Sequence, residues 1–247
     1  MNSNELPDFR EMRALRDEFA RFLLSYKFGS DEMLTKINIL KEAFELTHDY
    51  SPIEHVSFRL KSADSIFEKA RRRGIELSLV SIRKNILDIA GIRITCSFIS
   101  DAYRLRDMLV RQEDVTVLET KDYIRNPKSN GYKSLHILLS VPVFTLDRVD
   151  QVPVELQIRT IAMDFWASLE HKIYYKYEGA VPERLIAELK DAADVADRLD
   201  RKMERLHEEV TDLQRTEKAH ERRSNPQLSE ELLEDFARAM RNPEPRP

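Results

Sequence analysis

The chain has 247 residues and 42% hydrophobic content, enough for one sizeable core within one domain or two small ones. Its 40 Lys and Arg are outnumbered by 44 Asp and Glu, and the net charge of −4 excludes a surface-wide field that would attract nucleic acid nonspecifically. A single Cys96 excludes internal disulfides, and no window approaches the roughly 18 apolar residues of a membrane span. The N-terminus lacks the layout of a signal peptide, so we expect a cytoplasmic protein without a membrane segment.

The first part of the chain is predicted to be helical. An amphipathic helix is indicated by apolar residues at three- and four-residue steps, namely Phe9, Met12, Leu15, Phe19 and Leu23. A second helix is expected from about Asp31 to Leu46, and a Ser-Pro pair at 51–52 then interrupts the pattern. Ser62 is a candidate N-cap for a third helix, rich in Lys and Arg, which Gly74 would end.

Short β-branched runs follow, and they predict strands over 92–98, 115–123, 134–144 and 152–158. A helix expected at 101–111 interrupts the strands. This order predicts an α+β fold, in which a mixed sheet is flanked by helices and long helices follow at the C-terminal end.

The predicted strands carry polar side chains at alternate positions. Val154, Leu156 and Ile158 share one face of their strand, whereas Glu155, Gln157 and Arg159 lie on the opposite face. The same alternation separates Arg93 and Thr95 from Ile92 and Ile94, and Tyr132, Ser134 and His136 from Leu135 and Ile137. Several strands would thus contribute to one polar face. The alternative is a sheet with one side simply exposed to water.

The C-terminal part is again helical. Residues 164–177 have the spacing of a helix packed on the sheet, and apolar residues alternate at four- and three-residue steps from Leu185 to Leu213. That seam requires a partner helix, either from the N-terminal part of the same chain or from a second subunit. Beyond Thr216 the sequence turns polar, and we expect 216–247 to be a mobile tail with a possible short helix near 229–240.

Residues 122–136, DYIRNPKSNGYKSLH, combine basic side chains, an Asn-Gly turn and two tyrosines. Such a loop is suited to gripping phosphates and stacking on a base. Asp88 and Glu155 each lie in a strand-like apolar run, and Mg²⁺ needs only one or two carboxylates in addition to substrate phosphates. The surrounding basic set is Arg59, Lys61, Lys69, Arg93, Arg125, Lys128 and Lys133. The pattern indicates a nucleotide enzyme, although acids and cations of this kind also occur as ordinary solvated surface.

Five segments together resemble the small alarmone synthetases, nearest to their RelQ type and next to their RelP type: RLKSADSIFEKARRRG (59–74), DIAGIRI (88–94), YIRNPKSNGYKSLH (123–136), VELQIRT (154–160) and FWASLEHKIYYKY (165–177). The resemblance runs from about residue 30 to 215. It implies a nucleotidyltransferase-like fold and a synthetase domain over 1–215. It also implies transfer of the pyrophosphate of ATP to the 3′-hydroxyl of GDP or GTP in the stringent response, with AMP released.

The resemblance also implies roles for single residues. Asp88 and Glu155 would hold Mg²⁺, and Glu155 would take the proton from the attacking hydroxyl. The residues implied for ATP are Arg59 and Arg93 on the adenine, with Lys61, Ser65 and Lys69 near the phosphates. Tyr132 would stack on guanine, and the residues implied around the acceptor are Lys128, Lys133, His136 and Gln157.

The resemblance further implies a homotetramer and no hydrolase activity, since the dipeptide His48-Asp49 stands without the other ligands and the extra domain that alarmone hydrolases require. RelQ-type members can bind alarmone in a central cleft. The corresponding positions here are Leu34, Asn38, His55 and Asp164, where lost cations and an added acid disfavour a polyphosphate. Two other readings stay open: an RNA-binding regulator that uses the basic loop, and a structural oligomer built on the 185–213 seam.

Overall fold

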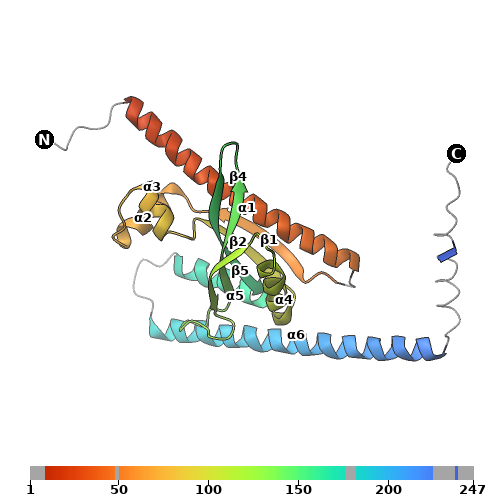
Figure 1. The fold of residues 1–247 in the computed structure, drawn as a ribbon. Helices are drawn as coiled ribbons and strands as arrows, with labels where there is room; N and C mark the ends of the chain where they lie inside the picture. The colour runs from red at the N-terminus through yellow and green to blue at the C-terminus, as the bar shows by residue number, and fades with distance from the viewer. Residues whose placement is uncertain (1–8, 48–49, 176–181, 225–236, 239–247) are drawn as a thin grey trace. The chain divides into compact units, whose positions relative to one another are not determined.

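The computed structural model describes residues 9–47, 50–175, 182–224 and 237–238, and the chain divides into two units, 1–200 and 201–247. The first unit contains a five-stranded sheet of order β1-β2-β5-β4-β3 (Figure 1). Its strands are β1 (Ile53–Leu60), β2 (Ala90–Cys96), β3 (Thr116–Asp122), β4 (Leu135–Phe144) and β5 (Val149–Thr160). β2 and β5 are parallel and the other neighbours are antiparallel, which confirms the predicted mixed sheet.

Strand β1 was not predicted from the sequence. It is an edge strand whose side chains are mostly exposed or half-buried, and its apolar and polar residues alternate only over Val56–Leu60. A register shift between Ile53 and His55 further breaks the pattern. As a consequence, Arg59 lies on the sheet itself, opposite Gly91 of β2.

Helix α1 (Phe9–Thr47) is continuous, so the prediction of two separate N-terminal helices was wrong. It crosses the sheet and packs against β1, β2, β4 and β5 (Figure 1). A Cβ atom at Gly29 would lie 2.6 Å from Val152 Cγ1, so the missing side chain lets α1 approach β5 closely. Gly29 and Ser30 look like helix breakers in the sequence, but both are buried against the sheet, where packing decides the conformation.

The remaining helices are α2 (Ala63–Arg72), α3 (Leu79–Asn85), α4 (Ile99–Val110), α5 (Ile161–Tyr175) and α6 (Glu183–Ser224). The predicted cap of α2 is confirmed, since the Ser62 hydroxyl accepts a hydrogen bond from the Ser65 amide at 3.3 Å. Gly74 follows α2 with a φ of 63°, which suits glycine. The short helix α3 was not predicted.

The core lies on the apolar face that the alternation predicted. Val154, Leu156 and Ile158 of β5 are fully buried there, and residues of α1 and α4 complete the same cluster. A small second cluster joins Trp166 of α5 to Ala193 of α6, with Tyr132 packed against it. Because the first, larger cluster fills the apolar side of the sheet, the alternate residues of β2, β4 and β5 lie on the other side.

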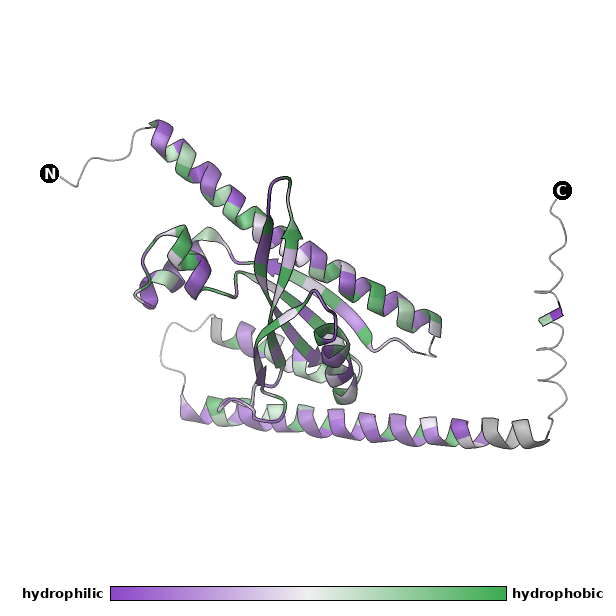
Figure 2. Ribbon diagram, viewed as in Figure 1, coloured by the Kyte–Doolittle hydropathy of each residue, from purple (hydrophilic) through white to green (hydrophobic). Residues whose placement is uncertain are grey.

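Helix α6 continues to Ser224, beyond the boundary expected at Thr216. Its ribbon is largely hydrophilic in Figure 2, and the apolar residues of the predicted seam are exposed from Leu199 to Leu213. The expected mobile tail falls mostly outside the described residues, as does His48-Asp49. Within the described part of the chain, no helix is long and apolar enough to cross a membrane.

Candidate functional site

The polar face of the sheet brings side chains from separate motifs into one row. Arg93 of β2 is paired with Gln157 of β5, which is paired in turn with His136 of β4. Glu155 lies two residues before Gln157, at the next position on the same face of β5, opposite Gly91 of β2. The strands that carry these residues are adjacent, so the sequence alternation correctly placed them on one face.

A pocket of about 460 Å³ opens over the β1, β2 and β5 side of this face. Its lining includes seven polar residues, namely Ser57, Arg59, Lys61, Asp88, Arg93, Glu155 and Gln157. Arg59 and Arg93 project from neighbouring strands into the same cavity. The pocket therefore joins two guanidinium groups, a lysine and both acids singled out in the sequence.

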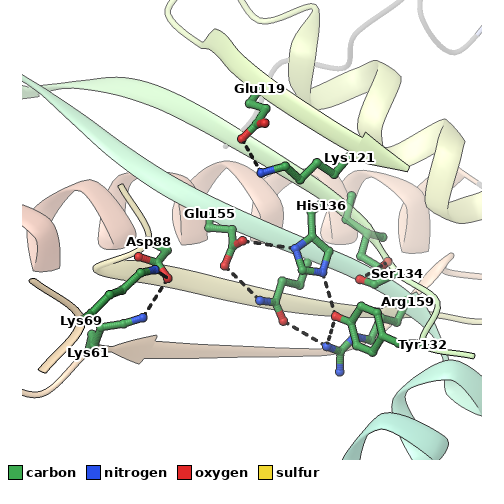
Figure 3. A network of polar contacts seen from close by, with 12 residues as sticks. Lys61, Lys69, Asp88, Glu119, Lys121, Tyr132, Ser134, His136, Glu155 and Arg159 are labelled. Carbon is green, nitrogen blue, oxygen red and sulfur yellow. Dashed lines mark hydrogen bonds and ion pairs between the residues drawn. The ribbon is translucent and has the colours of Figure 1, made fainter. Parts of the chain in front are cut away.

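Asp88 lies two residues before the start of β2 instead of within the strand. Its Oδ2 accepts hydrogen bonds from Lys61 Nζ at 2.9 Å and from Lys69 Nζ at 2.5 Å (Figure 3). Burial acts to raise the pKa of Asp88, but the two lysines outweigh it and bring the pKa from 3.8 to about 2. The carboxylate is therefore ionised, and its Oδ1 is buried without a hydrogen-bond partner.

Glu155 receives two hydrogen bonds on its two oxygens. His136 Nδ1 lies 3.2 Å from Oε1, and the Gln157 amide donates to Oε2 at 3.0 Å. Burial acts to raise the pKa of Glu155, but the contacts with His136 and Gln157 outweigh it, so the pKa lies below its ordinary value. Glu155 is thus an ionised acceptor at the edge of the pocket.

An aromatic group lies on the other side of Glu155. The Tyr132 hydroxyl is 2.7 Å from His136 Nε2, and the Tyr123 ring packs edge-on against both residues. Lys128 Nζ lies over the two tyrosine rings, 4.8 Å from the centre of Tyr123 and 4.6 Å from that of Tyr132. Residues from the loop and from β4 therefore form one continuous surface next to the pocket.

The loop that carries Tyr132 has the predicted Asn-Gly turn. Gly131 has a φ of 89°, and a Cβ atom there would lie 2.6 Å from Ala193 Cβ of α6. The Asn130 side chain accepts a hydrogen bond from the Tyr132 amide at 3.2 Å and donates to Glu170 at 3.2 Å. These contacts fix the position of Tyr132 relative to α5 and α6.

Two residues implied by the resemblance make their contacts elsewhere. Lys133 is ion-paired with Asp197 of α6 at 2.5 Å, and the Ser65 hydroxyl accepts a hydrogen bond from Ser62 at 3.0 Å. Neither lines the pocket. Their roles toward nucleotides remain predictions.

Arg159, Tyr123 and Asp164 were not among the predicted site residues. Arg159 of β5 donates to the Tyr132 hydroxyl at 2.6 Å and to Asp164 Oδ1 at 3.1 Å, and Tyr123 completes the aromatic group. Asp164 of α5 also lies 3.5 Å from Arg93 Nε. The strand alternation did place Arg159 on the polar face, but only the folded chain shows which residues it contacts.

The carboxylates of Asp88 and Glu155 suit a cation that is also bound by the phosphates of a substrate. No group of three or more His, Cys, Asp or Glu side chains able to hold a metal occurs among the residues that the structure describes. Asp88 and Glu155 face the same pocket, and the buried Oδ1 of Asp88 has an unused lone pair. Two carboxylates with space for phosphate oxygens fit Mg²⁺.

Comparison with known proteins places this site in a family. Residues 58–180 match the model of the region found in RelA and SpoT proteins. The GTP pyrophosphokinase YwaC of Bacillus subtilis (strain 168) is 47% identical over 200 residues, which cover 81% of this chain and 95% of that protein.

Solved structures show the same relationship. Small alarmone synthetase 1 of Bacillus subtilis, bound to its product pppGpp, superposes with a TM-score of 0.72 at 40% identity and covers 78% of this chain and 98% of its own. The same synthetase bound to AMPCPP gives a TM-score of 0.67 at 37% identity, over 79% and 98% of the two chains.

Fold and site together thus define a synthetase of the RelA/SpoT class. The chain belongs to the small alarmone synthetases and is a GTP pyrophosphokinase.

Proposed function

We propose that this enzyme transfers the pyrophosphate of ATP to the 3′-hydroxyl of GDP or GTP, giving ppGpp or pppGpp and AMP. The observation that carries the proposal is the position of Glu155. This carboxylate lines the pocket that holds Asp88, Arg59 and Arg93, and it also contacts His136 of the aromatic group. A group in that position can contact both a donor in the pocket and an acceptor on the tyrosine.

ATP is assigned to the pocket. Arg59 and Arg93 would enclose the adenine between their guanidinium planes, which is chemically suited to a π system. Lys61, Ser65 and Lys69 would contact the phosphates, and the two lysines already converge on Asp88. The related synthetase bound to AMPCPP supports a nucleotide donor.

The acceptor is assigned to the aromatic side of Glu155. Tyr132 would stack on guanine, and the residues proposed around this nucleotide are Lys128, Lys133, His136 and Gln157. Lys128 already lies over the Tyr132 ring, and His136 contacts its hydroxyl. The related synthetase has pppGpp as its product, which supports a guanine nucleotide as the acceptor.

In the proposed reaction, Glu155 accepts the proton of the 3′-hydroxyl. A bond forms between that oxygen and the β-phosphorus of ATP, and the bond between the α- and β-phosphates breaks to release AMP. Asp88 and Glu155 would hold Mg²⁺, which when bound would neutralise charge on the transferred group. Because both carboxylates are ionised well below neutral pH, each is ready for these roles.

The test uses radiolabelled ATP, Mg²⁺ and GDP or GTP, followed by separation of the nucleotides. Asp88→Asn and Glu155→Gln should each abolish synthesis while the protein stays folded. Asp31→Asn, which changes an exposed carboxylate paired with Lys27 on α1, is the matched control and should retain activity. Near-normal turnover in either site variant would contradict the assignment, and so would label that never leaves ATP in the parent enzyme.

We also propose that the enzyme is a homotetramer without hydrolase activity. The exposed apolar residues along α6, from Val195 to Leu213, support association through this helix. Light scattering after gel filtration should give four times the mass of the chain. Incubation of purified ppGpp with the enzyme and Mn²⁺ should release no pyrophosphate.

A further inference from the structure

Arg159 is a buried arginine that makes three polar contacts at the site. Its side chain is 5% exposed. Nη2 donates to the Tyr132 hydroxyl at 2.6 Å (Figure 3) and to Gln157 Oε1 at 3.1 Å. Nη1 donates to Asp164 Oδ1 at 3.1 Å. One guanidinium thus joins α5, the tyrosine loop and strand β5.

Two chains of hydrogen bonds lead from Arg159 to Glu155. The first passes through the Tyr132 hydroxyl and His136 to Glu155 Oε1. The second passes through the Gln157 side chain to Glu155 Oε2. Both oxygens of the carboxylate are therefore positioned by groups that Arg159 holds, and the contacts close into a ring.

The guanidinium constrains the hydrogen bonds of this ring. An ionised carboxylate only accepts, so His136 donates from Nδ1 to Glu155, and in the neutral tautomer that carries this proton Nε2 accepts from the Tyr132 hydroxyl. Arg159 can only donate, so it takes a lone pair of that hydroxyl and leaves the hydroxyl proton for His136. It also takes the amide oxygen of Gln157, which turns the amide nitrogen toward Glu155.

Stability alone does not explain a guanidinium at this position. Its Nε is buried without a hydrogen-bond partner, and the nearby charge of Arg93 opposes it, although Asp164 lies between the two arginines. Burial of a charge with an unused donor is unfavourable, and an apolar side chain of similar volume would often be at least as stable. The contacts with Tyr132 and Gln157 therefore point to a role at the site.

We propose that Arg159 is a positioning residue for the acceptor half of the reaction. It holds the Tyr132 ring through its hydroxyl and orients Glu155 through His136 and Gln157. This inference rests on the proposed function, because it takes Tyr132 as the surface on which the guanine nucleotide stacks. Arg159 acts through these residues and does not itself contact the reacting atoms.

The test is a double-mutant cycle in the full-length enzyme. Arg159→Met, Tyr132→Phe and the double variant are compared with the parent in KM for GDP, KM for ATP and kcat. Arg159→Met should lower kcat/KM for GDP by about tenfold or more, the effect expected for a lost charged hydrogen bond, and leave KM for ATP within about twofold. Arg148→Met, which changes an exposed arginine paired with Asp150, is the matched control and should behave as the parent.

The coupling between the variants separates positioning from a general structural effect. In the Tyr132→Phe background, Arg159→Met should lower kcat/KM for GDP by a clearly smaller factor than in the parent, since the contact with the Tyr132 hydroxyl is already lost and only the path through Gln157 remains. An undiminished effect in that background, or an equal rise in both KM values, would overturn the proposal. If Arg159→Met does not fold, Arg159→Lys carries the same comparison, because it keeps the charge beside Asp164 but cannot reach three acceptors at once.

Binding of GDP alone, measured by calorimetry, distinguishes the two proposals. A parent enzyme that binds GDP but makes no alarmone would contradict the proposed reaction, whereas weaker GDP binding by Arg159→Met would still support positioning. Normal synthesis and normal GDP binding in Arg159→Met would overturn the positioning role and leave the proposed function intact.

Discussion

Removal of one lysine from Asp88 should increase the affinity of the enzyme for a divalent cation in the absence of nucleotide. Lys61 and Lys69 both donate to Asp88 Oδ2, and their side chains are only 14% and 15% exposed. The single negative charge is therefore already balanced by two positive charges. A divalent cation arriving alone would meet a net positive group, whereas ATP would bring phosphates that attract the lysines away.

The structure allows a rough magnitude. Two unit charges 4 Å apart interact by about 4 kcal/mol at an effective dielectric constant of about 20, and a divalent ion doubles this to about 8 kcal/mol. A lysine side chain can swing away from the incoming ion, so only a fraction of that repulsion is retained. With about 1.4 to 2.8 kcal/mol retained, Lys69→Met should tighten cation binding by about 10- to 100-fold.

Isothermal titration of Mn²⁺ or Mg²⁺ into nucleotide-free protein measures this effect. Lys27→Met is the matched control, since Lys27 forms an exposed ion pair with Asp31 on α1, and its cation affinity should equal that of the parent. Asp88→Asn combined with Lys69→Met should lose the gain. Equal cation affinities in the parent and in Lys69→Met would refute the reasoning, whatever the effect of either variant on synthesis.

Three further predictions concern stability and loop geometry. The pKa of Asp88 is lowered from 3.8 in the unfolded chain to about 2 in the folded protein. The ionised carboxylate therefore adds about 1 to 2 kcal/mol to the free energy of unfolding above pH 3.8, and this contribution is lost as the pH falls toward 2. In urea titrations, the difference in unfolding free energy between the parent and Asp88→Asn should shrink over this range. Gly29→Ala should destabilise the fold by about 1 to 3 kcal/mol despite its better helix propensity, because its Cβ would overlap Val152, and an unchanged melting temperature would contradict the close packing of α1. Gly131→Ala combines a left-handed φ with overlap against Ala193, so it should raise KM for GDP and leave KM for ATP unchanged; equal changes would mean that this loop does not serve the acceptor alone.

The sequence predicted the central strands and the polar face because both depend on local alternation. β2, β4 and β5 are fully buried on one side and mostly only partly buried on the other, so their apolar and polar residues largely alternate. The same reasoning missed β1, which lies at an edge and is mostly exposed. It also divided α1 at Gly29 and Ser30, since nothing local indicates that these two small residues face β5.

In the site too, local sequence patterns identify single residues but not their contacts with distant parts of the chain. Asp88 and Glu155 could be singled out because each is an acid in an apolar run, but their shared pocket depends on the parallel pairing of β2 with β5. Lys133 was expected beside the acceptor because the family resemblance implied it. The folded chain pairs it with Asp197, a residue of a helix more than sixty positions away in the sequence. Ion pairs across such distances cannot be read from spacing.

Glu155 differs from Asp88 in how its charge is held, and this difference follows from the strand order. Asp88 lies just before β2, and its partners are Lys61 and Lys69, which a polyphosphate can draw away. Glu155 lies in the middle of the sheet between β2 and β4, so its partners are His136 and Gln157, which belong to a ring of directed hydrogen bonds. A carboxylate held by lysines that phosphates can attract is suited to exchanging them for a metal when ATP arrives. A carboxylate fixed by an oriented ring is suited to accepting a proton at a defined position, and the proposed reaction needs one residue of each kind.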